Sequence, residues 1–153
     1  MAETRADAVA VVVLRGDGDA AEVLLVCRGG GAFAGAWTLV MGGVEPGERA
    51  TDTARRELLE ETGIAAGELY TLGFLDAFYD PVRDKIVHVP FFVTRIGHDA
   101  AEIVLEPDVH DAHRWASLAE ARPLLTFSAQ RRALDEVQHA FVRDAPAAWR
   151  LIR

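Results

Sequence analysis

Three glutamates with helical spacing are the residues of this chain that point most directly to chemistry. Glu57, Glu60 and Glu61 stand at positions i, i+3 and i+4, so on a helix all three carboxylates project from one face. Three neighbouring anions repel one another, and the arrangement is destabilising unless a cation compensates it. Carboxylate oxygens are hard ligands that suit Mg²⁺ or Mn²⁺. The spacing therefore predicts a divalent-metal site, with a solvated acidic helix face as the alternative.

Two neighbours extend this candidate site. Glu48 precedes the predicted helix and can add a fourth carboxylate. Arg56 precedes Glu57 and lies one turn from Glu60, so its guanidinium can fix the orientation of a carboxylate that binds metal.

The helix that must carry these glutamates is the strongest secondary-structure prediction in the chain. Residues 50–62 contain no glycine or proline, and Gly63 follows where a left-handed C-terminal cap belongs. Further helices are predicted from Ser117, which opens a capping box with Glu120, and from Ser128, where an amphipathic pattern begins. Runs of β-branched and aliphatic residues predict strands at 8–14, 22–27, 37–40, 69–75, 86–94 and 113–115. The resulting order, β-β-β-α-β-β-β-α-α, predicts an α/β (α+β) domain with a mixed sheet and helices packed on it.

The composition narrows the function classes. The 153 residues are half hydrophobic and about a quarter charged, which predicts one domain over residues 1–153. The net charge of −8, with no run of Lys or Arg longer than two, argues against a nucleic-acid polymer as partner. The apolar run 8–14 is far shorter than the ~20 residues that span a bilayer, so no membrane association is expected. Because Cys27 is the only cysteine, no intramolecular disulfide can form, and the cytoplasm is the expected location.

The pattern of these residues matches a known family. Gly42-x5-Glu48-x7-Arg56-Glu57-Leu58-x-Glu60-Glu61-x-Gly63-Ile64 resembles the Nudix box at every defining position. The resemblance to the Nudix (MutT-like) hydrolases covers most of the chain and implies a mixed β-sheet sandwiched between α-helices. The tail segment 110–115 (HDAHRW) is similar to that of the dATP and dihydroneopterin triphosphate pyrophosphohydrolases.

This resemblance implies a reaction and roles for individual residues. The reaction would be Mg²⁺-dependent, or Mn²⁺-dependent, cleavage of the diphosphate linkage of a small nucleotide, foremost a (d)NTP to the (d)NMP and pyrophosphate. Glu57, Glu60 and Glu61, together with the carbonyl of Gly42, would hold the metal. Glu57, Arg56 and Glu60 are the catalytic candidates, with Glu57 as the first choice for the base and Arg56 orienting it.

The resemblance also points to a substrate-binding residue. Arg28, which follows a predicted strand, looks like the family's phosphate-contacting arginine. The alternative is a solvated arginine at the end of a strand.

The chain departs from its apparent relatives at one metal-directed position. Many of them place a glutamate directly before the tail histidine, where this chain has Val109. Asp108 is our first choice as a replacement, because Pro107 favours an irregular conformation there. Glu106, Asp111 and no replacement at all are the alternatives.

Other functions are weighed beside this one. Within the hydrolases, ADP-ribose and dinucleoside polyphosphates are the alternative substrates. A non-catalytic Nudix nucleotide-binding module would be expected to lack box carboxylates, which this chain retains. An isopentenyl-diphosphate isomerase-like enzyme would need a catalytic cysteine, and Cys27 within a predicted strand is a poor candidate. The oligomeric state is left open, with a homodimer among the options.

Overall fold

The computed structural model describes residues 3–100 and 102–153. Its strands are β1 (Ala8–Arg15), β2 (Glu22–Arg28), β3 (Trp37–Thr38), β4 (Val40–Gly43), β5 (Leu69–Asp80), β6 (Lys85–Arg95) and β7 (His110–Ser117). Its α-helices are α1 (Ala50–Thr62), α2 (Leu118–Leu124) and α3 (Ser128–Val137). Short turns of other helix types lie at Gly18–Ala20, Gln138–Arg143 and Ala148–Arg150.

The seven strands form one sheet with β1 at its centre. On one side β1 pairs in parallel with β6, and β5 lies beyond β6. On the other side β1 has two antiparallel partners, because β4 pairs with Ala8–Val11 and β2 with Leu14 and Arg15. β2 also pairs with β3 and β7. β4 therefore enters the sheet between β1 and the diverging end of β2.

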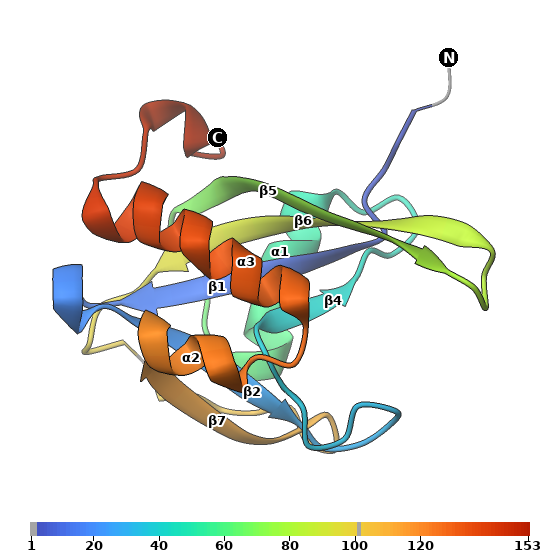
Figure 1. Cartoon of the computed structure of the whole chain (residues 1–153), viewed down its shortest axis with the longest axis horizontal. Helices are drawn as coiled ribbons and strands as arrows, with labels where there is room; N and C mark the ends of the chain where they lie inside the picture. Colours follow the sequence, from blue (N-terminus) through green and yellow to red (C-terminus); the bar gives the residue numbers. More distant parts are fainter. Residues whose placement is uncertain (1–2, 101) are drawn as a thin grey trace.

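Both faces of β1 are buried, which explains its uninterrupted apolar sequence. Its even-numbered residues pack in one hydrophobic core with Leu134 of α3. Its odd-numbered residues from Val9 to Val13 pack in a second core with Leu58 of α1. α1 and α3 lie on opposite faces of the sheet (Figure 1). This arrangement confirms the predicted mixed sheet covered by helices.

Three strand predictions differ from the structure. The strand predicted at 37–40 is divided into β3 and β4, because the chain changes its pairing partner from β2 to β1 at Leu39. β5 continues to Asp80 and β7 begins at His110, both beyond the predicted ends. None of the side chains in the added part of β5, residues 76–80, is buried, so no buried apolar face marks it as a strand. Pairing with β6 supplies its hydrogen bonds instead.

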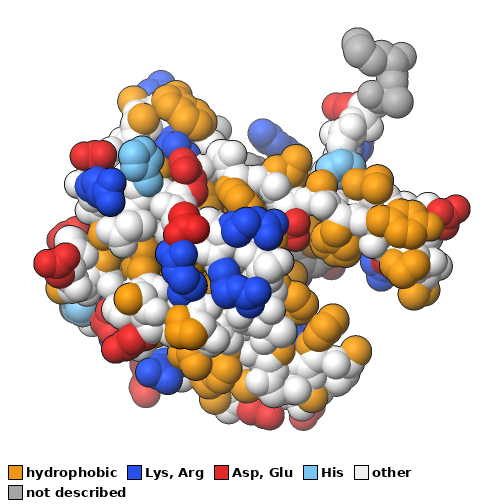
Figure 2. Space-filling view, in the orientation of Figure 1, with side chains coloured by type: hydrophobic (Ala, Val, Ile, Leu, Met, Phe, Trp, Pro, Cys, Tyr) orange, Lys and Arg blue, Asp and Glu red, His pale blue; other side chains and the backbone are white. Residues whose placement is uncertain are grey.

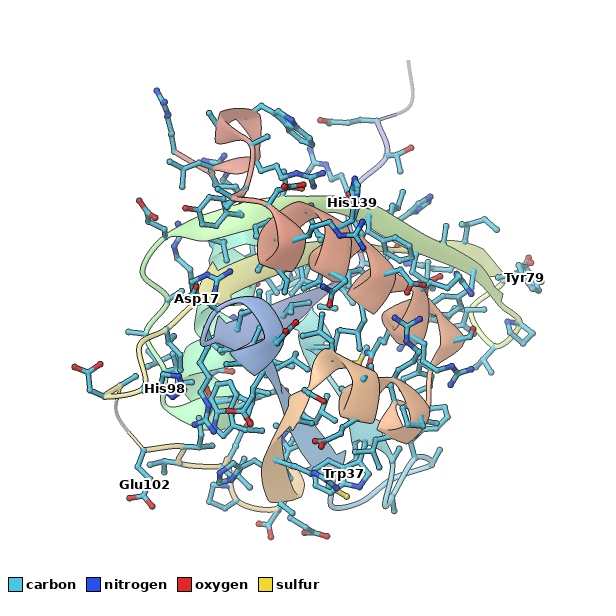
Figure 3. The ribbon with its side chains drawn as sticks, turned by 60° about the vertical axis from the view of Figure 1, so that its left-hand side comes forward. Asp17, Trp37, Tyr79, His98, Glu102 and His139 are labelled. Carbon is cyan, nitrogen blue, oxygen red and sulfur yellow. The ribbon has the colours of Figure 1, made fainter. Side chains whose placement is uncertain are left out.

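The ends of β5 and β6 form an arm that projects from the body of the molecule (Figure 1). Tyr79 lies near the tip of this arm (Figure 3), where its hydroxyl donates to Asp84 at 2.7 Å. Figure 2 shows the surface hollowed between the arm and the loop that follows β2. Among the described residues, no helix has the length and apolar character needed to cross a membrane.

Candidate active site

The glutamates of α1 line one pocket of about 460 Å³. Glu57, Glu60 and Glu61 are joined there by Glu106, and Gly42 and Gly43 of β4 form part of the wall. α1 ends as its sequence predicts: Gly63 adopts a left-handed conformation (φ 74°), and its N–H donates to the carbonyl of Leu59. The helix therefore presents its three carboxylates on the face directed toward β4.

Arg56 is the hydrogen-bonding centre of this face. Its guanidinium donates to both carboxylate oxygens of Glu48, from Nε at 2.8 Å and from Nη2 at 2.9 Å. Its Nη1 donates to Glu57 at 2.8 Å and to Glu60 at 3.1 Å. Nη2 also donates to the carbonyl of Gly43 at 3.1 Å. Arg56 thus connects α1 to the end of β4, and its role in orienting the carboxylates stays a prediction.

Glu48 does not reach the pocket that the other glutamates line. The bonds from Arg56 and from the Thr53 hydroxyl lower its pKa to about 2, so it stays ionised. Thr53 Oγ1 donates to Glu48 at 2.5 Å. The expectation that Glu48 supplies a fourth carboxylate is therefore not supported, because the structure engages it in holding Arg56.

Gly42 allows β4 to lie directly against Glu57. A Cβ atom at position 42 would overlap the carboxyl group of Glu57. Any larger residue must displace the glutamate or the strand. The metal-binding role of the Gly42 carbonyl stays a prediction, whereas its close packing against Glu57 is a feature of the structure.

Glu61 is the most strongly perturbed carboxylate of the site. Its side chain is 6% exposed, and one carboxylate oxygen has no hydrogen-bond partner. Burial, then the charges of Glu57 and Glu106, raise its pKa to about 8. Burial also raises the pKa of Glu57, and the Arg56 guanidinium opposes this effect.

The carboxylates of this pocket are possible ligands of a divalent cation. A buried, unpartnered carboxylate oxygen among further carboxylates is a donor set that fits a hard divalent cation. Within the described ranges, no three metal-ligating side chains converge on a single point. Arg56 donates hydrogen bonds to two of the glutamates, Glu57 and Glu60. A cation would therefore compete with Arg56 for Glu57.

The fourth carboxylate of the pocket is that of Glu106, one of the alternatives to Asp108. Asp108 is exposed, adopts a left-handed conformation (φ 65°) and does not line the pocket. Asp111 is exposed as well and lies close to Gly29. The backbone amides of residues 109 and 110 both donate to the Glu106 carbonyl, so a tight turn separates Glu106 from Asp108. Because this turn decides which acidic side chain reaches the pocket, the local sequence does not distinguish Glu106 from Asp108.

Arg28 is the only basic residue that lines the pocket in the described part of the chain. It stands at the end of β2, where the register with β7 shifts between Cys27 and Arg28. Its charge lowers the pKa of Glu61, although burial and the neighbouring carboxylates outweigh it. The structure therefore brings Arg28 together with the glutamates, as the resemblance implies. Met41 also lines the pocket, and no local sequence signal indicates this.

Known proteins resemble this chain in sequence and in fold. Residues 4–137 match the family model of the NUDIX domain. The asymmetrical bis(5'-nucleosyl)-tetraphosphatase of Rattus norvegicus is 38% identical over 112 residues, which cover 72% of this chain and 75% of that protein. The RNA pyrophosphohydrolase of Caulobacter vibrioides is 35% identical over 119 residues, covering 69% of each chain.

A solved structure extends the likeness in fold. The dihydroneopterin triphosphate pyrophosphohydrolase of E. coli superposes with a TM-score of 0.71, covering 93% of this chain and 100% of that one. At 23% identity this likeness shows the fold alone. With the family model matching residues 4–137 and two relatives above 30% identity, the chain belongs to the Nudix family of hydrolases that act on phosphoanhydride bonds.

Proposed function

We propose that this chain is a Mg²⁺-dependent pyrophosphohydrolase of small nucleotides. One observation carries the proposal: a single pocket gathers Glu57, Glu60, Glu61 and Glu106 against one arginine, Arg28. The carboxylates suit a hard divalent cation, and the guanidinium suits a phosphate oxygen. Together they match the two needs of a phosphoanhydride substrate, charge neutralisation and orientation.

The four glutamates would hold Mg²⁺ or Mn²⁺, with the Gly42 carbonyl as a further donor. The chemistry that a bound cation supplies there is neutralisation of the substrate phosphates and a lower pKa for water. The unpartnered oxygen of Glu61 is the observation that best supports this role, because an ionised carboxylate buried without a partner is costly.

The protein's own groups would then position the reactants. Arg28 would bind a phosphate oxygen through charge-assisted hydrogen bonds. Glu57 would accept the proton of the attacking water through a carboxylate oxygen that the cation leaves free. In the metal-free protein, burial raises the pKa of Glu57 and the Arg56 guanidinium opposes this effect. Arg56 would hold Glu57 and Glu60 in place while water attacks phosphorus in line with the leaving group.

Two classes of nucleotide are the candidate substrates, one from the resemblance of the tail segment and one from the comparisons. Cleavage of a (d)NTP to the (d)NMP and pyrophosphate is the reaction that the tail resemblance favours. By their names, the two curated relatives act on a bis(5'-nucleosyl) tetraphosphate and on RNA. This observation favours a dinucleoside polyphosphate as the second candidate. The net charge of −8 weighs against a polymer such as RNA.

A product analysis would test the proposal. The purified protein would be incubated with dATP, diadenosine tetraphosphate or ADP-ribose, with Mg²⁺ or with EDTA, and the products separated by chromatography. Pyrophosphate released from dATP, or two different nucleotides from the tetraphosphate, would identify the substrate class. Hydrolysis in ¹⁸O-labelled water would locate the phosphorus that is attacked.

Glu57→Gln is the matched control, because it keeps the side-chain volume and removes the proposed base. We expect turnover that requires a divalent cation and is lost in Glu57→Gln. Equal turnover in EDTA, or in Glu57→Gln, would contradict the proposal.

A further inference from the structure

Gln130 is a buried polar residue that connects α3 to the strand beside the carboxylate pocket. Its side chain is 2% exposed within the hydrophobic core. Its Oε1 accepts a hydrogen bond from the backbone N–H of Leu39 at 2.9 Å. Its Nε2 donates to Met41 Sδ at 3.3 Å. Both contacts join segments that lie about 90 residues apart in the chain.

Leu39 needs such a partner because of its place in the sheet. Trp37 and Thr38 pair with β2, whereas Val40–Gly43 pair with β1. Leu39 therefore belongs to neither ladder, and it is completely buried. A buried N–H without an acceptor is strongly destabilising, so the point where the chain changes partners requires an acceptor from elsewhere. Gln130 supplies it.

The segment that Gln130 holds leads directly into the pocket. Met41 lines the pocket together with Glu61. The next residue, Gly42, packs against the carboxyl group of Glu57. A shift of this segment would therefore move the surroundings of two metal-directed carboxylates at once.

We propose that Gln130 is a positioning residue of the active site, which fixes β4 against α1 so that Glu57 and Glu61 are held ready for a cation. This inference rests on the proposed function for its kinetic consequence, whereas its effect on metal affinity can be measured without turnover. The competing interpretation is a buried glutamine that stabilises the fold and leaves the pocket unaffected.

Gln130→Met tests this role, because methionine has a similar length and lacks the amide acceptor and donor. The matched control is Thr94→Val. Thr94 is fully buried, its Oγ1 donates to the Glu68 carbonyl at 2.9 Å, and it does not line the pocket. Each variant would be compared with the wild type for Mn²⁺ affinity by electron paramagnetic resonance, thermal stability, kcat and KM. Both variants lose one hydrogen bond to a backbone group, which is buried at Gln130 and partly buried at Thr94, so both are expected to lower the melting temperature.

Only Gln130→Met is expected to weaken Mn²⁺ binding, by about tenfold, as for other residues that orient metal ligands. It should also lower kcat more than it raises KM. If Gln130→Met does not fold, Gln130→Asn keeps the amide, shortens the side chain, and is expected to weaken Mn²⁺ binding in the same direction.

Wild-type Mn²⁺ affinity in a folded, destabilised Gln130 variant would overturn the proposal. A wild type that binds Mn²⁺ and hydrolyses no nucleotide would refute the proposed function, and the Mn²⁺ comparison would still decide the role of Gln130. A wild type that does not bind Mn²⁺ would overturn both.

Discussion

Glu61 is expected to make the metal-free protein less stable as the pH rises, and Glu61→Gln is expected to remove that dependence. The cause is the pocket itself, since burial and the charges of Glu57 and Glu106 raise the pKa of Glu61 from 4.5 to about 8. The unfolded chain, in contrast, exposes this carboxyl group to water and ionises it at its ordinary pKa.

The magnitude follows from these two pKa values. Below pH 4.5 the carboxyl group of Glu61 is protonated in both states and has no effect on stability. Above it, the unfolded state ionises while the folded state keeps its proton, so the free energy of unfolding falls by about 1.4 kcal/mol per pH unit. The decline continues until the pH reaches the folded pKa of about 8, where the folded state ionises as well. At pH 7 the loss amounts to about 3 kcal/mol.

The measurement is urea unfolding of EDTA-treated protein between pH 5 and pH 9. Glu60→Gln is the matched control, because Glu60 is about half exposed and its removal leaves the buried carboxyl group in place. We expect the wild type and Glu60→Gln to lose about 4 kcal/mol over this range relative to Glu61→Gln. Saturating Mg²⁺ should cancel the difference, since a cation favours ionised Glu61. Parallel pH curves for wild type and Glu61→Gln would refute the reasoning.

Three further predictions concern the roles of Glu60, of Arg28, and of Glu106 compared with Asp108. Glu60→Gln should lower kcat by at least ~10²-fold with an unchanged circular dichroism spectrum, because it removes a metal-directed charge; near-wild-type turnover at saturating Mg²⁺ would contradict the metal role. Arg28→Ala should mainly raise KM, since a charge-assisted phosphate contact contributes ~1.5–3 kcal/mol; an unchanged KM for every active nucleotide would indicate a solvated arginine. Glu106→Gln should raise the Mg²⁺ concentration that gives half-maximal rate, whereas Asp108→Asn should leave it unchanged. A raised Mg²⁺ requirement in Asp108→Asn alone would identify Asp108 as the metal-directed residue.

The features predicted from the sequence are those set by local patterns. The apolar run of β1 predicts a strand because both of its faces are buried, and Gly63 predicts the end of α1 because it adopts a left-handed conformation. The spacing of Glu57, Glu60 and Glu61 predicts that they share one face of α1, because helical geometry alone places these positions together. The box region could therefore be interpreted before any tertiary contact was known.

The features that were not predicted depend on contacts between distant segments. The break at Leu39 follows from a change of pairing partner and from the acceptor that Gln130 provides, and neither is a property of residues 37–40. Glu106 reaches the pocket through a turn whose conformation excludes Asp108, although both acids flank the same proline. Local propensity cannot rank such neighbours, because the difference arises from where the turn meets α1.

The parallel pairing of β1 with β6 has a consequence for how the protein is made. Ala10 of β1 pairs with Phe91 of β6, so the central strand is synthesised long before its main partner. At ~5–20 residues per second, the ribosome needs roughly 4 to 16 s to produce the intervening segment. During that interval the most apolar strand of the sheet has no parallel partner, and its exposed edge is open to pairing with other chains. Chaperone contact with the nascent chain is therefore expected to concentrate on residues 8–15 until residues 85–95 emerge.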